Sequence, residues 1–199
     1  MGTYIERLKN YEQEMNFEKK GLTFTVSGLS GSGKTALAKA IAQEFDLKMV
    51  QAGDIFRELA KEKNISIEDM STQTKEAEDI EADVRTLELA KKGGVVLVGR
   101  LAGWAAGGNA DVKIWVHTDL DVRAKRVANR DHKTLEEAKK DLIERDSKDR
   151  ERYKNVYNID LQDTSIYDML INNTNLSWNQ FTQGSIKQLK NYISDKNES

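Results

Sequence analysis

The chain has 199 residues, of which 32% are charged and 38% are hydrophobic, and its formal net charge is -2. This length suits one domain with a hydrophobic core, and the balance of charge gives no overall positive field for holding a nucleic-acid polymer. Because the chain has no cysteine, disulfides, thiolate catalysis and zinc–thiolate sites are excluded. The charged start of the chain lacks the apolar stretch of a secretory signal. No apolar run approaches the roughly 18 residues needed to cross a bilayer, so we expect a cytoplasmic protein that binds neither membranes nor nucleic-acid polymers.

Residues 1–20 are predicted to form a helical extension ahead of the main domain. Ile5, Leu8, Tyr11 and Met15 recur at helical spacing, as in an amphipathic helix. The pattern leaves open whether this extension packs on the domain that follows or contacts another protein.

From residue 21 to residue 199, strand-like runs alternate with helical patterns in what we expect to be a single domain. The predicted strands are 22–27, 48–51, 95–98, 112–116 and 167–171, and the predicted helices are 34–45, 54–61, 66–92, 120–129, 134–154 and 178–194. Such alternation predicts the α/β class, with a central parallel sheet of about five strands flanked by helices. In such sheets, ligands bind beyond the carboxyl ends of the strands.

A phosphate-binding loop follows the first predicted strand. Residues 28–35 match the pattern G-x-x-x-x-G-K-[ST], and they lie between a strand and a helix, which is the context that makes the motif credible. Backbone N–H groups of such a loop and the start of the helix bind phosphate oxygens. Lys34 is predicted to reach the β- and γ-phosphates, and the Thr35 hydroxyl to bind Mg²⁺. The predicted ATP-binding residues are Gly28, Leu29, Ser30, Gly31, Ser32, Gly33, Lys34 and Thr35.

Two other interpretations of this loop fail. Residues 31–36 also match the dinucleotide pattern G-x-G-x-x-A, but that pattern needs an acidic residue at the end of the second strand, where Gln51 stands. A signalling GTPase would need D-x-x-G and N-K-x-D segments, and the chain has neither.

Three later segments carry arginines that could reach the same edge of the sheet. Residues 52–57 read A-G-D-I-F-R after the second strand, and residues 99–104 read G-R-L-A-G-W after the third. Residues 145–152 read R-D-S-K-D-R-E-R, which places three of their charged side chains on one helix face. By spacing alone, such a charged helix face is more often a solvated surface, where an ion pair contributes about 0.5 kcal/mol or less.

The order of these segments resembles the nucleoside-monophosphate kinases, and most closely the archaeal type of cytidylate kinase, from about residue 22 to about residue 178. The resemblance implies a P-loop kinase fold with a helical acceptor-binding segment at about 53–92 and a short lid at about 126–138. It implies transfer of the γ-phosphoryl group of ATP to CMP, and to dCMP, with Mg²⁺ as cofactor. Its partners would be small nucleotides, and we expect a monomer.

The resemblance also assigns roles to individual residues. Arg57, Arg100 and Arg145 would grip the acceptor phosphate, because planar guanidinium groups suit bidentate phosphate contacts. Asp149 could accept a hydrogen bond from the cytosine amine, and Arg152 could donate to the ring acceptors.

Other residues are assigned to the transferred phosphate and the metal. Lys34 would act on the transferred phosphate. Of Arg126 and Arg130, one would pack on adenine and the other would reach the transferred phosphate, with Arg123 as an alternative for either role. Asp54 could bind a water of the Mg²⁺ shell, as Thr35 binds the ion itself.

Two alternatives stay open at this stage. A kinase of the same architecture could use another acceptor, such as AMP or UMP, and a non-catalytic nucleotide-binding protein could use the loop as a ligand switch. One departure concerns the metal arrangement, because Val98 stands where related sequences often place glutamate.

Overall fold

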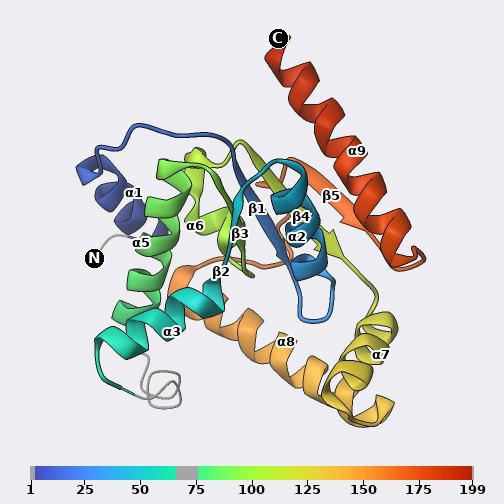
Figure 1. Cartoon of the computed structure of the whole chain (residues 1–199). Helices are drawn as coiled ribbons and strands as arrows, with labels where there is room; N and C mark the ends of the chain where they lie inside the picture. The colour runs from blue at the N-terminus through green and yellow to red at the C-terminus, as the bar shows by residue number, and fades with distance from the viewer. Residues whose placement is uncertain (1–2, 66–75, 199) are drawn as a thin grey trace.

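The computed structural model describes residues 3–65 and 76–198, and its centre is a parallel sheet (Figure 1). Residues 66–75, within the predicted helix 66–92 and the predicted acceptor-binding segment, lie outside the described residues, as do residues 1–2 and 199. The strand order is β2-β3-β1-β4-β5, and every neighbouring pair is parallel. The strands are β1 (Thr23–Gly28), β2 (Lys48–Gln51), β3 (Val95–Val98), β4 (Val112–His117) and β5 (Met169–Asn172). This confirms the predicted fold class.

Helices cover both faces of the sheet and extend below its carboxyl edge. α2 and α9 pack together on one face, and α5 and α6 pack on the other. α7 and α8 form a hairpin beyond the carboxyl edge (Figure 1). The helices are α1 (Tyr4–Glu14), α2 (Lys34–Glu44), α3 (Ala52–Glu62), α5 (Glu76–Lys92), α6 (Ala102–Ala105), α7 (Leu120–Asp131), α8 (Leu135–Tyr157) and α9 (Trp178–Asn197), with a 3₁₀ turn at Gly107–Asn109. None of the helices in the described ranges is long and apolar enough to cross a membrane.

Strands β1 and β3 show why the sheet could be predicted from the sequence. Every residue of β1 and of β3 is buried, as expected for strands covered on both faces. The predicted bounds of the second and third strands are confirmed at Lys48–Gln51 and Val95–Val98. The last strand begins at Met169 rather than at 167, because Tyr167 still belongs to a turn in which its N–H bonds the Thr164 carbonyl at 3.1 Å.

The N-terminal helix α1 packs against α5 and α8, not against the sheet (Figure 1). Thr3 begins the helix with a capping box to Glu6, which satisfies backbone N–H groups in the first turn. At the other end, the Lys91 amine donates to the carbonyls of Glu12 and Met15, each at 2.7 Å. Leu8 is buried between these two attachments, so α1 is packed onto the domain that follows it.

Replacing Leu8 by alanine should test this packing. Leu8 is 5% exposed, and removing a buried leucine side chain costs about 2–4 kcal/mol through lost burial and the cavity that remains. The loss should appear in urea unfolding as a lower midpoint with an unchanged slope. The control is Tyr11→Ala on the same helix, where the side chain is 43% exposed and the change should stay within about 0.5 kcal/mol. Equal stability of Leu8→Ala and the wild type would contradict the packing.

Candidate active site

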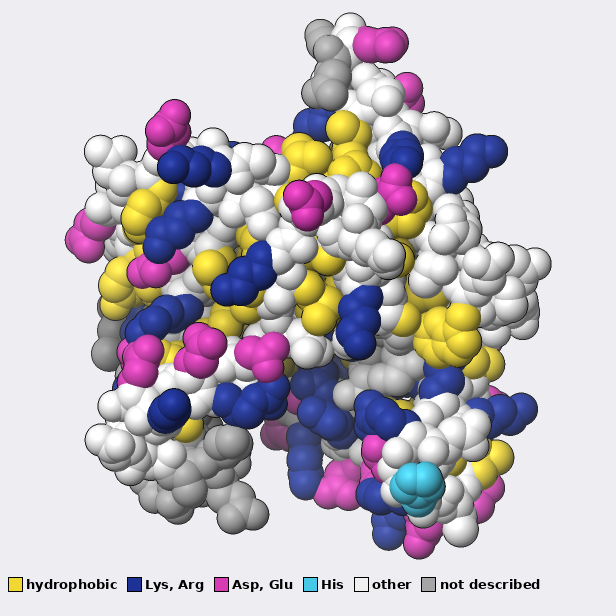
Figure 2. Space-filling model, in the orientation of Figure 1, with side chains coloured by type: hydrophobic (Ala, Val, Ile, Leu, Met, Phe, Trp, Pro, Cys, Tyr) yellow, Lys and Arg dark blue, Asp and Glu magenta, His cyan; other side chains and the backbone are white. Residues whose placement is uncertain are grey.

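A cavity of about 530 Å³ opens at the carboxyl ends of β1, β2 and β3. Its walls come from the phosphate loop, the starts of α3 and α6, and one face each of α5 and α8. Figure 2 shows Lys and Arg side chains gathered around a hollow between α3 and α7. The cavity brings together half of the residues predicted for the site, namely Ser30, Lys34, Thr35, Arg57, Arg100, Arg145, Asp149 and Arg152.

The phosphate loop has the backbone geometry that its glycines allow. Gly28 and Gly33 have φ angles of 147° and 95°, which side-chain-bearing residues rarely adopt. A Cβ on Gly28 would lie 2.5 Å from the Val116 carbonyl oxygen, so only glycine fits beside β4. Gly33 is the residue before α2, which places the helix N-terminus and its unpaired N–H groups at the loop.

The ends of β4 and β5 brace the loop from behind through the carbonyl of Ser32. Asn173 Nδ2 donates to this carbonyl at 2.9 Å, and Thr118 Oγ1 lies 3.1 Å from it. The single hydroxyl proton of Thr118 has a closer acceptor in Asn173 Oδ1, at 2.6 Å, and all three residues are buried. Sequence reasoning missed Asn173, although it follows the last strand at the ligand edge, where polar residues are expected to act.

Lys34 lies in a crowded positive environment at the loop. Its amine donates to the Leu29 carbonyl at 2.7 Å. Burial, together with the charges of Arg100, Arg145 and Arg123, lowers the pKa of Lys34 from 10.5 to about 7, while Asp146 acts in the opposite direction. A bound phosphate anion would offset the repulsion between Lys34 and these arginines, so the resting site favours an anionic ligand.

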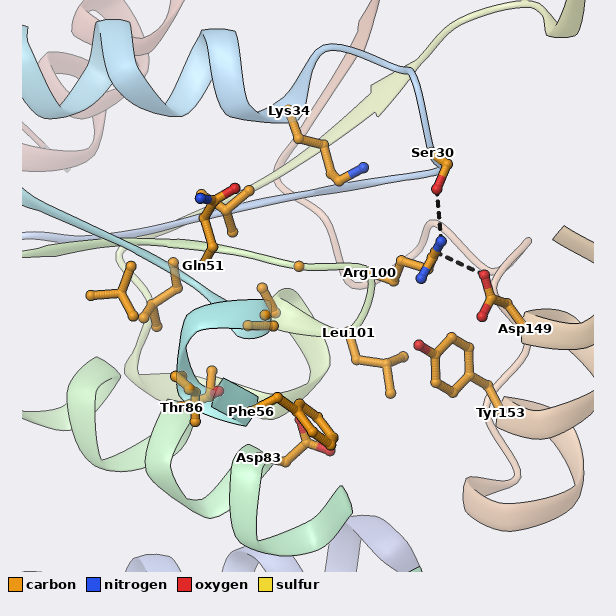
Figure 3. A pocket seen from close by; sticks show the side chains of 18 of the residues that line it. Ser30, Lys34, Gln51, Phe56, Asp83, Thr86, Arg100, Leu101, Asp149 and Tyr153 are labelled. Carbon is orange, nitrogen blue, oxygen red and sulfur yellow. Dashed lines mark hydrogen bonds and ion pairs between the residues drawn. The ribbon is translucent and has the colours of Figure 1, made fainter. Parts of the chain in front are cut away.

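Arg100 connects the phosphate loop to α8. Its guanidinium donates to the Ser30 hydroxyl at 2.7 Å, and its Nε lies 2.9 Å from Asp149 Oδ2 (Figure 3). Both charged side chains are 16% exposed. Burial raises the pKa of Asp149 although Arg100 and Arg145 favour its charged form. Asp149 therefore lies at the phosphate end of the cavity, where it aligns Arg100.

Arg123 braces the loop, whereas the sequence had offered it as an alternative phosphate contact. It donates to the Ser30 carbonyl at 3.1 Å and to the Thr118 carbonyl at 3.2 Å. Its Nη2 forms an ion pair with Asp146 Oδ2 of α8 at 2.9 Å, and both side chains are largely buried. Spacing gave no signal for Asp146, because only the packing of α7 on α8 shows which helix face meets which arginine.

The two arginines predicted to act on the transferred phosphate or adenine lie outside the lining of this cavity. Arg126 Nη1 donates to Asn173 Oδ1 at 3.1 Å and to the Ser32 carbonyl at 3.3 Å, and its guanidinium lies 4.5 Å from the centre of the half-exposed Trp178 ring. Arg130 forms a two-point ion pair with Asp131, at 2.6 Å and 2.8 Å, on the surface of α7.

The predicted metal residues occupy different surroundings. Thr35 Oγ1 lies in the cavity and donates to Gln51 Oε1 at 3.3 Å. Asp54 pairs with Arg57 and lines a neighbouring surface groove instead of this cavity. In the ranges 3–65 and 76–198, no group of three or more His, Asp or Glu side chains could hold a metal ion.

The end of the cavity away from the loop mixes aromatic and polar side chains. Phe56 and Asp83 lie there in Figure 3, while Ser30, Lys34 and Arg100 lie at the opposite end. Thr86 of α5 and Tyr153 of α8 complete this part of the wall. Sequence reasoning missed these residues, since α5 is charged along its length and nothing marks one acidic side chain as facing a cavity.

A P-loop at the end of a parallel sheet, beside a cavity with further arginines, defines a P-loop kinase architecture. The model of the cytidylate kinase-like family matches residues 23–175, and the chain belongs to that family. A cytidylate kinase of Pyrococcus horikoshii is 48% identical over 161 residues, which are 80% of this chain and 83% of that protein. A cytidylate kinase of Methanocaldococcus jannaschii is 43% identical over 155 residues, or 75% of this chain and 87% of that protein.

Solved structures support the fold alone. A gluconokinase from Sinorhizobium meliloti is similar with a TM-score of 0.58 and 13% identity, covering 90% of this chain and 98% of its own. A shikimate kinase from Acinetobacter baumannii in complex with shikimate has a TM-score of 0.56 and 15% identity, and the match covers 89% of this chain and 96% of that chain.

The lowered pKa of Lys34 predicts how ATP affinity depends on pH. Phosphate stabilises the charged amine, so binding above pH 7 must take up a proton, and affinity should fall as pH rises from about 7.5 to about 9.5, approaching tenfold per unit. The γ-phosphate is already ionised over this range. Titration calorimetry across this range measures the slope.

Two variants separate Lys34 from other groups in that titration. Lys34→Arg should flatten the slope, because a guanidinium stays charged. Lys39→Ala, an exposed residue of α2, should leave the slope as in the wild type. A flat wild-type profile would show that Lys34 is already charged before ATP binds.

Proposed function

We propose that this protein transfers the γ-phosphoryl group of ATP to CMP, and to dCMP, to give the diphosphates. One observation carries the proposal: the P-loop lysine Lys34 and the arginines Arg100, Arg145 and Arg152 line one cavity. Two phosphate groups that must react would repel each other, and this cluster of cations can hold both. The family relatives named cytidylate kinase support CMP as the acceptor.

The donor would bind with its β- and γ-phosphates on the loop. Backbone N–H groups at the start of α2 and the amine of Lys34 bind the phosphate oxygens. Mg²⁺ would bind Thr35 together with phosphate oxygens, with the Gln51 amide oxygen nearby. It would neutralise charge on the transferred group. Asp54 would reach it only through water, and only if its pair with Arg57 opens.

The acceptor would bind with its phosphate at the same end. Arg100, already held by Ser30 and Asp149, is a preformed donor, and Arg145 and Arg57 line the same cavity. No general base is required, because the attacking oxygen belongs to a phosphate that is already an anion. The chain then needs only to align the two groups and stabilise charge.

Asp149 and Arg152 are proposed to contact the acceptor nucleoside. The pair between Asp149 and Arg100 keeps that carboxylate near the phosphate end, which supports a contact with the sugar side of the nucleoside. Arg152 lines the same wall one turn further along α8. The amine of the base lies at the far end of a nucleotide from its phosphate, and it needs a partner deeper in the cavity.

Arg126 and Arg130 are proposed to act when the tip of the α7–α8 hairpin closes. This tip, about residues 126–138, would be the lid that excludes water and prevents ATP hydrolysis. Arg126 is close to the loop through Ser32. Arg130 would have to leave Asp131, an exchange that an exposed ion pair allows at low cost.

A switch protein that binds ATP without a reaction is less well supported. Such a protein has no second phosphate to grip, whereas several arginines surround this cavity beside the loop. An AMP or UMP kinase would keep the same phosphate geometry and differ only in the base contacts.

The proposal is tested by following ADP formation with Mg²⁺·ATP and separate samples of CMP, dCMP, UMP, AMP and GMP. CMP and dCMP should turn over rapidly, and the others at rates lower by about 10² or more. Lys34→Ala should abolish turnover, and Lys39→Ala on the exposed face of α2 should not. Preference for AMP would keep the kinase and change the acceptor, while turnover with none of the five would remove the catalytic proposal.

A further inference from the structure

A hydrogen bond from Tyr4 connects the N-terminal helix to the wall of the acceptor cavity. The Tyr4 hydroxyl donates to Asp83 Oδ2 at 2.8 Å, and Asp83 lines the cavity. Tyr4 lies outside residues 23–175, the segment that the family model matches. The contact therefore joins an element of this chain beyond the family segment to the site where the acceptor is proposed to bind.

Tyr4 is held rigidly in place. Its side chain is buried, and its ring centre lies 4.4 Å from that of Tyr157 on α8. Burial and the neighbouring Asp83 charge raise the pKa of Tyr4 well above 10, so the hydroxyl stays protonated and remains a donor at neutral pH. The capping box at Thr3 begins the helix one residue earlier and fixes the backbone at this point.

Asp83 lies at the end of the cavity where the acceptor base must be. Phosphates meet beside Lys34 and Arg100, and Figure 3 shows Asp83 and Phe56 at the opposite end. A nucleotide whose phosphate is at the first end points its base toward the second. Phe56 offers a flat apolar surface beside the carboxylate, as suits an aromatic base.

A carboxylate at this point can distinguish one pyrimidine from the other. Cytosine carries an exocyclic amine, which donates, where uracil carries a carbonyl oxygen, which accepts. A carboxylate has about four lone-pair directions, so it can accept from more than one donor, and a ligand amine can bind beside Tyr4. The same carboxylate would repel the uracil oxygen.

We propose that Asp83 accepts a hydrogen bond from the amine of the acceptor base, and that Tyr4 of the N-terminal helix positions Asp83 for this contact. Asp83 is thereby a specificity residue, and Tyr4 is a positioning residue that acts through it. The inference rests on the proposed function and adds the source of its base selectivity. It also gives the N-terminal helix a role in substrate choice.

The decisive variant is Asp83→Asn, because the wild-type geometry predicts which way its amide turns. Tyr4 donates, so the asparagine oxygen should face Tyr4 and its NH₂ group should face the cavity, where it can donate to the uracil carbonyl. The ratio of kcat/KM for CMP to that for UMP should fall by at least about 100-fold, with UMP use rising. ATP affinity should not change, since the loop is at the other end of the cavity.

Tyr4→Phe tests the positioning role. It keeps the ring packing against Tyr157 and removes only the hydroxyl. KM for CMP should rise and the CMP-to-UMP ratio should fall by about tenfold, with kcat nearly unchanged. The matched control is Tyr11→Phe, on the same helix and exposed, which should leave both quantities as in the wild type. Thermal unfolding and ATP binding of each variant check that it is folded.

The outcomes separate this inference from the proposed function. No CMP turnover by the wild type would remove the proposed function itself. Wild-type CMP turnover with an unchanged CMP-to-UMP ratio in folded Asp83→Asn would overturn only the role of Asp83. A loss of the ratio in Asp149→Asn, and not in Asp83→Asn, would move base reading to α8 and likewise overturn it. A changed ratio in Asp83→Asn but not in Tyr4→Phe would overturn the role of Tyr4.

Discussion

The constraint on which the site depends is the burial of Lys34 among other cations at one end of the cavity. Burial, together with the nearby charges of Arg100, Arg145 and Arg123, brings the pKa of Lys34 down to about 7. Like charges in a partly dehydrated site cost free energy until an anion joins them. The fold tolerates the cluster because Asp146 and Asp149 of α8 pair with Arg123 and Arg100. Bound phosphates would complete this compensation, so phosphate affinity is built into the resting arrangement.

α8 therefore has two functions in the fold. Through Asp146 and Arg123 it supports the carbonyl of Ser30 in the phosphate loop, and through Asp149 and Arg100 it reaches the Ser30 hydroxyl. The same helix presents Tyr153 and Arg152 to the acceptor end of the cavity. A movement of α8 would change the donor and acceptor sites together. This coupling suits an enzyme that must align two nucleotides, and a protein that only sensed ATP would not need it.

The sequence predicted the parts of the molecule that have a local pattern of neighbouring residues. β3, with its continuous apolar run, and the loop around Lys34 were recognisable because a buried parallel strand and a P-loop have local patterns. Arg57 and Arg100 were predictable because arginines after strands lie at the ligand edge. The sequence did not predict that Arg123 pairs with Asp146 or that Tyr4 bonds Asp83. The first contact joins the consecutive helices α7 and α8, and the second joins α1 to the distant helix α5. In both cases, tertiary packing decides which face of a charged helix meets which neighbour.

The central claim is that donor and acceptor phosphates share one cation-lined cavity, and one binding measurement tests it most directly. A single molecule in which adenosine and cytidine are joined by five phosphates can occupy both sites only if they are continuous. Calorimetric titration should give one site per chain, with affinity at least about 100-fold above that of ATP or CMP alone, because the second half binds intramolecularly. The account is contradicted if the joined molecule binds no more tightly than ATP.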